Sequence, residues 1–151
     1  MRLLISRSKD VSLSIGNKPC GHIDNGFLIY VGFVSLDDEK YFDKMIDKVI
    51  KLRIFEDENH KMNKNILDVN GDIFLISSFT LFANCKGCNR PSFNGALNGA
   101  DAKILYDKFV DKFKTIFPNK LELGEFGADM EVSSTNDGPI NIIFDSKELY
   151  E

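Results

Sequence analysis

Two short segments of the sequence combine hydroxyl, glycine and proline residues in a way that offers chemistry through hydroxyl and backbone groups. The first, Ser77-Ser78-Phe79-Thr80, follows an apolar run, and the second is Asn136-Asp137-Gly138-Pro139. Glycine adopts backbone angles that are closed to other residues, whereas proline fixes its φ angle and has no N–H group. These residue types beside strands indicate a site in which backbone atoms face a ligand.

The common patterns of nucleophilic and nucleotide-binding enzymes are missing from the sequence. Neither histidine, His22 or His60, lies in a catalytic motif, and no Gly-x-Ser-x-Gly elbow, P-loop or Rossmann glycine pattern occurs. Thr80 would act as a nucleophile only if another group took its proton. Backbone N–H groups near Ser77 and Thr80 remain as groups able to hold an ester oxygen. Two plainer alternatives stay open at this point, because Ser and Thr also end strands and Gly138-Pro139 also suits an ordinary turn with a trans bond.

Cys85 and Cys88 form a Cys-x-x-Cys pair, which is the spacing of a redox pair or of half a zinc site. A zinc site needs two further ligands, and neither histidine stands in a ligand spacing. We therefore expect no metal and no cofactor, and we interpret the pair as two thiols in a glycine-containing turn. A redox protein that uses both thiols is the alternative, and it would lose its activity when both are replaced by serine.

Composition indicates an ordinary globular protein with a single domain, residues 1–151. Apolar residues make up 43% of the chain and charged residues 28%. The net charge of −4 argues against a protein that coats long nucleic acid, but it allows a small site that binds one end. No apolar run approaches the ~20 residues of a membrane helix, and the early charge of Arg2 argues against a signal peptide. We expect a cytoplasmic protein that does not bind membranes.

Periodicity predicts two main helices among several strands. Asp37 or Asp38 is suited to cap a helix with an apolar stripe from Tyr41 to Ile50, and a second helix runs from Ala100 or Asp101 to Phe117. Strands are expected at residues 3–5, 11–16, 26–34, 72–77, 121–123, 130–132 and 140–144, with a polar connection over residues 53–63. Strands and helices do not alternate regularly, which favours an α+β fold with a mostly antiparallel or mixed sheet, or a barrel-like core.

Together these segments resemble the D-aminoacyl-tRNA deacylase family over nearly the whole chain. Besides Ser77 to Leu81 and Asn136 to Pro139, the resemblance rests on Met1-Arg2, Arg7, Gly32, Leu52-Arg53-Ile54-Phe55, Lys61-Met62-Asn63, residues 87–93 and Gly124 to Met130. It implies a homodimeric hydrolase that cleaves the ester between a D-amino acid and the terminal adenosine of tRNA, as a proofreader in translation. The expected partner is then the 3′ end of a tRNA that carries a D-amino acid or glycine.

The resemblance also implies where the active site lies. The expected catalytic segment consists of Ser77, Ser78, Phe79 and Thr80. This segment would face the Gly-Pro of the other subunit, whose bond is cis in the family and whose carbonyl groups leave no room for an L side chain. Glycine has no side chain to collide, so its ester would also be accepted. The residues expected on this substrate-binding side are Gly138, Pro139, Asn136, Arg7 and Met130, with Arg7 as a support for the Gly-Pro turn and Met130 as a pocket or core wall.

For the chemical step we favour Thr80 as a positioning residue over Thr80 as a covalent nucleophile, because the sequence shows no base beside it. The neighbouring ribose hydroxyl of the substrate would then activate water. Backbone N–H groups of Ser78, Phe79 or Thr80 would hold the developing oxyanion.

Four positions depart from the pattern of the family. Ser78 stands where the family has Gln, Ile140-Asn141 replaces the Val-Thr that follows Gly-Pro, and Ser6 replaces the usual Gln. A site built mainly from backbone groups would tolerate these changes, whereas a site that depends on those side chains would not. The alternative hypothesis is a catalytically weak or inactive relative that binds an aminoacyl or nucleotide end without turnover.

Overall fold

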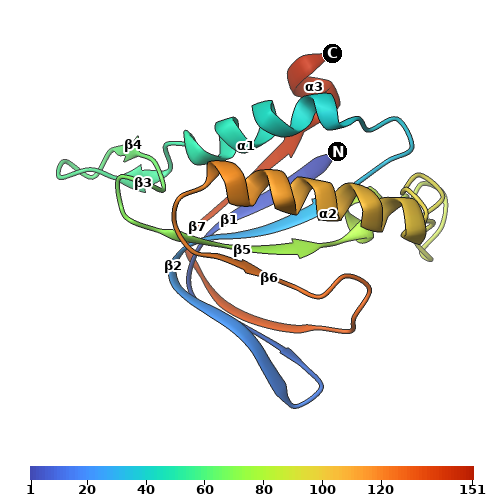
Figure 1. Ribbon diagram of the computed structural model, residues 1–151, viewed down its shortest axis with the longest axis horizontal. Coiled ribbons are helices and arrows are strands. Elements are labelled where there is room, and N and C mark those ends of the chain that lie inside the picture. Colours follow the sequence, from blue (N-terminus) through green and yellow to red (C-terminus); the bar gives the residue numbers. More distant parts are fainter.

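A five-stranded mixed sheet forms the centre of the molecule, and two helices cover one of its faces (Figure 1). The computed structural model describes residues 1–151. The strands are β1 (Arg2–Ile15), β2 (Lys18–Gly32), β5 (Asp72–Ser77), β6 (Leu121–Leu123) and β7 (Glu131–Asp145). Their order in the sheet is β6-β5-β2-β1-β7. β5 runs parallel to both of its neighbours, β2 and β6, whereas β1 is antiparallel to β2 and to β7.

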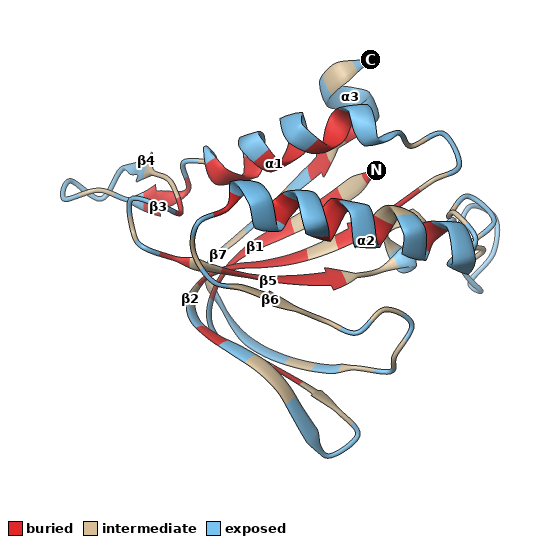
Figure 2. Ribbon diagram, viewed as in Figure 1, coloured by how far each residue is buried: buried red, intermediate tan, exposed pale blue.

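The covering helices are α1 (Phe42–Ile50) and α2 (Gly99–Ile116), and a short third helix, α3 (Ser146–Tyr150), ends the chain. A 3-10 turn, Glu39–Tyr41, leads into α1, and the carboxylate of Asp38 caps it by accepting the Lys40 N–H at 3.2 Å. Asn98 caps α2 in the same way by accepting the Asp101 N–H at 3.1 Å. The Asp38 cap fixes where the turn before α1 begins, and the Asn98 cap fixes where α2 begins. The apolar stripes of both helices face the sheet (Figure 2).

Phenylalanine supplies much of the core between the helices and the sheet. Phe27 of β2 stacks on Phe55 with their ring centroids 5.3 Å apart, and the fully buried Phe109 and Phe113 of α2 meet edge to face at 5.6 Å. Because side chains alternate along a strand, the opposite face of the sheet carries a second, smaller cluster. That cluster consists of Val11, Leu13, Ile23, Leu28, Phe74 and Ile76. β5 is thus packed on both faces, and its carboxyl end is held rigidly.

The structure confirms the α+β class, the mixed sheet and the two main helices, but the barrel-like alternative is wrong. β6 and β7 lie at opposite edges of the sheet and do not pair, so the sheet stays open. Residues 53–63 are not merely a polar connection, because they contain the hairpin β3 (Phe55–Glu56) and β4 (Met62–Lys64). The two strands expected over residues 130–144 are one strand, β7, interrupted by register shifts against β1. None of the helices is long and apolar enough to span a membrane.

Tyr106 of α2 provides a pH-dependent test of this packing. Its hydroxyl donates to the carbonyl of Leu75 on β5 at 3.3 Å, and burial, with a smaller effect of the Asp107 carboxylate, raises the pKa of Tyr106 to about 12. A folded pKa above the unfolded value of about 10 means that the stabilisation is complete below pH 10 and is lost as the pH rises toward 12. We expect the free energy of unfolding to fall across this window by about 2–3 kcal/mol more in the wild type than in Tyr106→Phe.

Urea denaturation of both proteins at pH 9, 10, 11 and 12 measures this difference. Taking the difference between the two proteins removes the contributions of lysines and other tyrosines that titrate in the same range. Parallel pH dependence in the two proteins would show that the phenol is not buried as described.

Candidate active site

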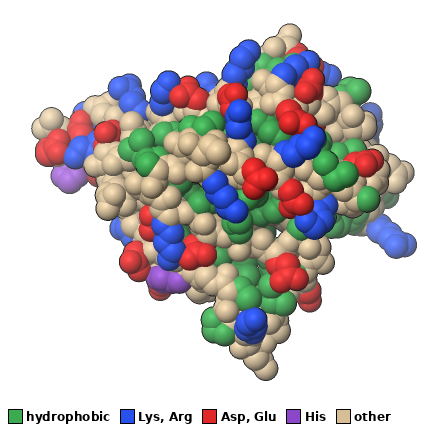
Figure 3. All heavy atoms as spheres, viewed as in Figure 1, with side chains coloured by type: hydrophobic (Ala, Val, Ile, Leu, Met, Phe, Trp, Pro, Cys, Tyr) green, Lys and Arg blue, Asp and Glu red, His purple; other side chains and the backbone are tan.

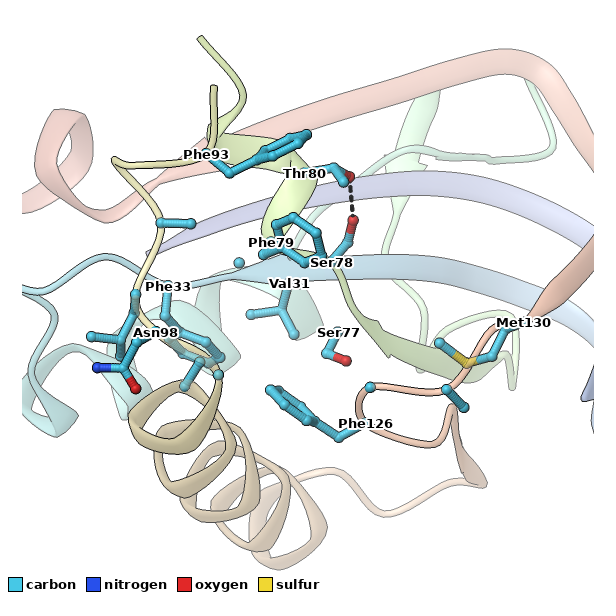
Figure 4. A pocket seen from close by; sticks show the side chains of 17 residues that line it. Val31, Phe33, Ser77, Ser78, Phe79, Thr80, Phe93, Asn98, Phe126 and Met130 are labelled. Carbon is cyan, nitrogen blue, oxygen red and sulfur yellow. Dashed lines mark hydrogen bonds between the residues drawn. The ribbon is translucent and has the colours of Figure 1, made fainter. Parts of the chain in front are cut away.

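A cavity of about 540 Å³ opens where β5 ends, between the sheet and the start of α2 (Figure 4). The end of β5 contributes Ser77, and the segment that follows it contributes Ser78, Phe79 and Thr80. The opposite walls come from three other parts of the chain, whose main side chains are Phe93, Asn98, Phe126 and Met130. Five of the residues expected in the site, Ser77 to Thr80 and Met130, therefore meet in this cavity.

The chain leaves the sheet at Ser78 because of one backbone hydrogen bond and one close contact. The Ser78 N–H donates to the carbonyl of Val31 on β2 at 2.7 Å, and a 3-10 turn, Phe79–Phe82, follows at once. The carbonyl oxygen of Ser78 lies so close to Gly32 that a Cβ atom on residue 32 would come within 2.8 Å of it. Glycine at position 32 is therefore required for this path of the chain.

Two backbone amides of this segment remain available to a ligand. The Ser78 N–H is already used by Val31, which removes it from the three amides suggested by the sequence. Phe79 and Thr80 begin the 3-10 turn, so their N–H groups have no acceptor within it. The Ser78 side chain caps neither of them, since its hydroxyl instead lies 2.7 Å from the Thr80 hydroxyl (Figure 4). The cavity is thus bordered by two unpaired amides and one hydroxyl pair.

Arg2 anchors this segment from outside the cavity. Its guanidinium donates to the carbonyl of Leu81 at 2.8 Å and lies 4.7 Å from the ring centroid of Phe82. The same group forms an ion pair with Asp145 at 2.9 Å. A single side chain of β1 therefore connects the 3-10 turn Phe79–Phe82 to the end of β7.

The lining of the cavity contains no ionisable side chain. Its residues are apolar, glycine, hydroxyl or amide types only. Phe79 and Phe93 meet edge to face with their centroids 4.9 Å apart, and Phe79 is 56% exposed at the mouth. No side chain of the lining can act as a general base for Thr80 or for water at neutral pH. The role of Thr80 as a residue that positions the substrate stays a prediction.

Phe93, Phe126 and Asn98 were not singled out from the sequence as site residues. Phe93 and Phe126 lie within segments that carry the family resemblance, but nothing in the sequence separates a phenylalanine in the wall of a cavity from one in the core. The position of Asn98 could have been predicted from the sequence, because an asparagine before a glycine and an amphipathic stretch is typical of a helix N-cap. Cys85 and Cys88 are exposed in the loop that leads to Phe93, and the Cys88 thiol lies 3.0 Å from the carbonyl oxygen of Arg90.

The Gly138-Pro139 turn lies elsewhere, on the exposed strand β7, and does not line the cavity of its own chain. Its peptide bond is cis. The turn coincides with a register shift of β7 against β1 between Ser6 and Ser8. The remaining predicted residues, Arg7 and Asn136, lie around this turn, so the structure divides the predicted site residues into two groups.

Arg7 supports the turn from within the same chain. Its side chain is 8% exposed, and its guanidinium donates to the carbonyls of Asp137 at 3.1 Å and Ile54 at 2.7 Å. An ion pair of 3.3 Å with the Asp137 carboxylate adds to these bonds. Arg7 therefore fixes the residue that precedes Gly138, and it links the turn to the segment that follows α1.

Two of the positions that depart from the family pattern meet each other beside the turn. The amide oxygen of Asn141 accepts the Ser6 hydroxyl at 2.6 Å and the side-chain N–H of Asn136 at 2.8 Å. Asn136 and Asn141 stand on either side of Gly138-Pro139, so this amide bridge closes the turn at its base. The hydroxyl at position 6 and the amide at position 141 form one hydrogen-bonded unit.

Comparison with known proteins identifies one family over nearly the whole chain. The family described as D-Tyr-tRNA(Tyr) deacylase matches residues 4–145. Proteins named D-aminoacyl-tRNA deacylase from Clostridium novyi (strain NT) and Clostridium tetani (strain Massachusetts / E88) are 47% and 43% identical; in each comparison 99% of this chain and 100% of the relative is covered.

Solved structures show the same fold. One described as c-Myc DNA Unwinding Element Binding Protein has a TM-score of 0.89 at 33% identity over 97% of this chain and 99% of that chain. A probable eukaryotic D-amino acid tRNA deacylase has a TM-score of 0.77 at 15% identity over 95% of this chain and 97% of that chain, a likeness of fold alone. The full-length matches and the family assignment agree, and the chain belongs to the D-aminoacyl-tRNA deacylase family, whose members are hydrolases of an ester bond.

Proposed function

We propose that this protein hydrolyses the ester bond of D-aminoacyl-tRNA and of glycyl-tRNA, releasing the free amino acid and tRNA. The observation that carries the proposal is the cavity at the end of β5, with two unpaired amides and a Ser78–Thr80 hydroxyl pair but no ionisable side chain. Membership of the deacylase family supports the choice of substrate. The 3′ end of an aminoacylated tRNA is the proposed partner.

The cavity supports a mechanism in which the substrate supplies the base. The vicinal ribose hydroxyl orients and activates a water molecule, which attacks the ester carbonyl carbon. The N–H groups of Phe79 and Thr80 hold the oxyanion that forms, and the Ser78–Thr80 hydroxyl pair fixes their position. The ester C–O bond then breaks, and the vicinal hydroxyl passes the proton lost by the attacking water to the released ribose oxygen, so that this hydroxyl ends the step unchanged. No covalent bond to Thr80 is needed at any step.

Discrimination against L-amino acids is proposed to come from a second protomer. Gly138 and Pro139 are exposed on an edge strand, and Ile143 of the same strand is 64% exposed. Unpaired strand edges with apolar side chains are suited to association with another chain. In the proposed homodimer the Gly138-Pro139 turn of one protomer enters the cavity of the other. Its backbone carbonyls exclude an L side chain, whereas a D side chain points toward solvent and glycine meets no obstacle.

The decisive experiment compares D-tyrosyl-, L-tyrosyl- and glycyl-tRNA, each carrying a labelled amino acid, with the purified protein. We expect release of D-tyrosine and glycine, with L-tyrosyl-tRNA hydrolysed no faster than in buffer. Tight binding of D-tyrosyl-tRNA without release would instead support the alternative of a relative without turnover. Release of D-tyrosine without any hydrolysis of glycyl-tRNA would contradict steric exclusion as the basis for rejecting L-amino acids.

Gly32→Ala tests the placement of the Ser77–Thr80 segment. The added Cβ would meet the Ser78 carbonyl oxygen at 2.8 Å and the Phe82 ring at 3.2 Å, so the segment must shift. Because a shift of up to about 1 Å in the groups that position a substrate slows the reaction, we expect kcat/KM for D-tyrosyl-tRNA to fall by about 10- to 100-fold in Gly32→Ala. Gly95→Ala is the matched control, because its Cβ would make only an ordinary contact at 3.9 Å. Equal activity of the two variants, both folded by circular dichroism, would show that this close approach does not position the site.

Asn141→Ala tests the amide bridge at the base of the turn. The substitution removes the acceptor of both the Ser6 and the Asn136 hydrogen bonds, each contributing about 1 kcal/mol. We expect a loosened turn to admit L substrates, so that the ratio of D to L hydrolysis falls about tenfold. Asn141→Asp keeps the acceptor and should retain the ratio of the wild type. An unchanged ratio in Asn141→Ala would mean that the bridge has no part in selectivity.

A further inference from the structure

A second cleft, of about 660 Å³, lies between the outer side of α1, the end of β7 and α3. It is lined by Lys44, Asp47, Lys48, Lys51, Leu52, Arg53, Phe144 and Tyr150, and we call it the basic cleft. Four of these eight residues are cations and only one is acidic. Elsewhere on the helices basic and acidic side chains are interspersed, as Figure 3 shows for one face of the molecule.

Three cations of the basic cleft have no acidic partner. Lys51 pairs with Asp47 at 2.7 Å, but Lys44, Lys48 and Arg53 form no ion pair. The ammonium groups of Lys44 and Lys48 instead lie 5.4 Å and 5.7 Å from the ring centroids of Tyr150 and Phe144. By contrast, three of the four lysines of α2 have an acidic partner: Lys103 pairs with Asp107 at 2.6 Å, Lys112 with Asp43 at 3.1 Å, and Lys108 with Glu39. In a chain of net charge −4, this is a local concentration of free positive charge.

The basic cleft is physically linked to the Gly138-Pro139 turn. Arg53 precedes Ile54, whose carbonyl accepts the Arg7 guanidinium at 2.7 Å, and the same guanidinium donates to the carbonyl of Asp137. Phe144, in the floor of the cleft, belongs to the same strand as Pro139. Phe144 lies five residue steps along the strand from Pro139, which corresponds to about 17 Å. The cleft thus stands at a fixed distance from the turn.

We propose that the basic cleft binds the phosphodiester backbone of the tRNA acceptor stem. The inference rests on the proposed function, in which the turn of this protomer lies at the 3′ end of a tRNA bound in the cavity of the other protomer. A distance of about 17 Å spans about five stacked nucleotides at 3.4 Å each. The unpaired cations of the cleft therefore meet phosphates of the stem, not those of the terminal adenosine. Such contacts position the tRNA without reading its sequence.

The test compares two triple variants that remove the same charge. The cleft variant is Lys44→Gln/Lys48→Gln/Arg53→Gln. The control is Lys18→Gln/Lys61→Gln/Lys114→Gln, which changes three exposed lysines that form no ion pair and lie outside the cleft. Each dimer is assayed with D-tyrosyl-tRNA and with the D-tyrosyl ester of adenosine, which is too short to reach the cleft.

We expect the cleft variant to raise KM for D-tyrosyl-tRNA by about 10- to 100-fold with little change in kcat, and to reduce the log–log salt slope by about 2 to 3. Hydrolysis of the adenosine ester should stay at the wild-type level in both variants. An equal rise of KM in the control variant would show that the effect comes from the net charge of the protein and not from the cleft, and it would overturn the proposal. A cleft variant with wild-type KM and salt slope would also overturn it.

A binding measurement separates this inference from the proposed catalysis. Fluorescence anisotropy with an uncharged acceptor-stem RNA hairpin requires no turnover, so it reports on the cleft even if the wild type hydrolyses neither ester. Weaker binding by the cleft variant alone supports the site. Equal affinity of the hairpin for the wild type, the cleft variant and the control variant would overturn the proposal.

Discussion

The hydrogen bond from the Ser78 N–H to the Val31 carbonyl is the interaction on which the candidate site depends. It is the last bond that holds the chain of β5 to β2, and it uses the first of the three amides that the Ser77–Thr80 segment could offer to a ligand. This hydrogen bond sets the direction in which the chain leaves the sheet, and the positions of the residues after Ser78 depend on that direction. The next two amides face no acceptor, the Ser78 hydroxyl turns to Thr80, and Gly32 is the only residue type that fits beneath the Ser78 carbonyl.

The same constraint explains why one chain alone does not contain all the predicted residues in one place. β5 lies two strands away from β1 and three from β7, so a turn on β7 cannot reach the end of β5 within the sheet. The Gly138-Pro139 turn is nevertheless fixed in place on two sides, by Arg7 and by the Asn136–Asn141 bridge. The turn is exposed and does not line the cavity of its own protomer. In the proposed homodimer a second copy of the chain would bring it to a cavity, and this is the physical basis for proposing that selectivity arises between subunits.

Periodicity and caps predicted most of the fold from the sequence, because they are local properties. The stripe from Tyr41 to Ile50 and the strand Asp72–Ser77 needed no knowledge of their neighbours. Closure of the sheet could not be predicted, because it depends on whether β6 and β7 meet. The contact between two residues that depart from the family pattern could not be predicted either. Ser6 and Asn141 look like two separate losses in the sequence, but they are opposite each other across β1 and β7 and share a hydrogen bond.

The absence of ionisable side chains from the cavity limits what its residues can contribute to the reaction. The amides and side-chain hydroxyls of the cavity can hold charge and direct a substrate, but none of them is a general base at neutral pH. The rate then depends on how well the ester is oriented, and selectivity depends on which substituents fit. A serine at position 78 is compatible with such a site, because its hydroxyl still orients Thr80. Side-chain chemistry can therefore vary at this position, whereas the backbone path through Gly32, Val31 and Ser78 cannot.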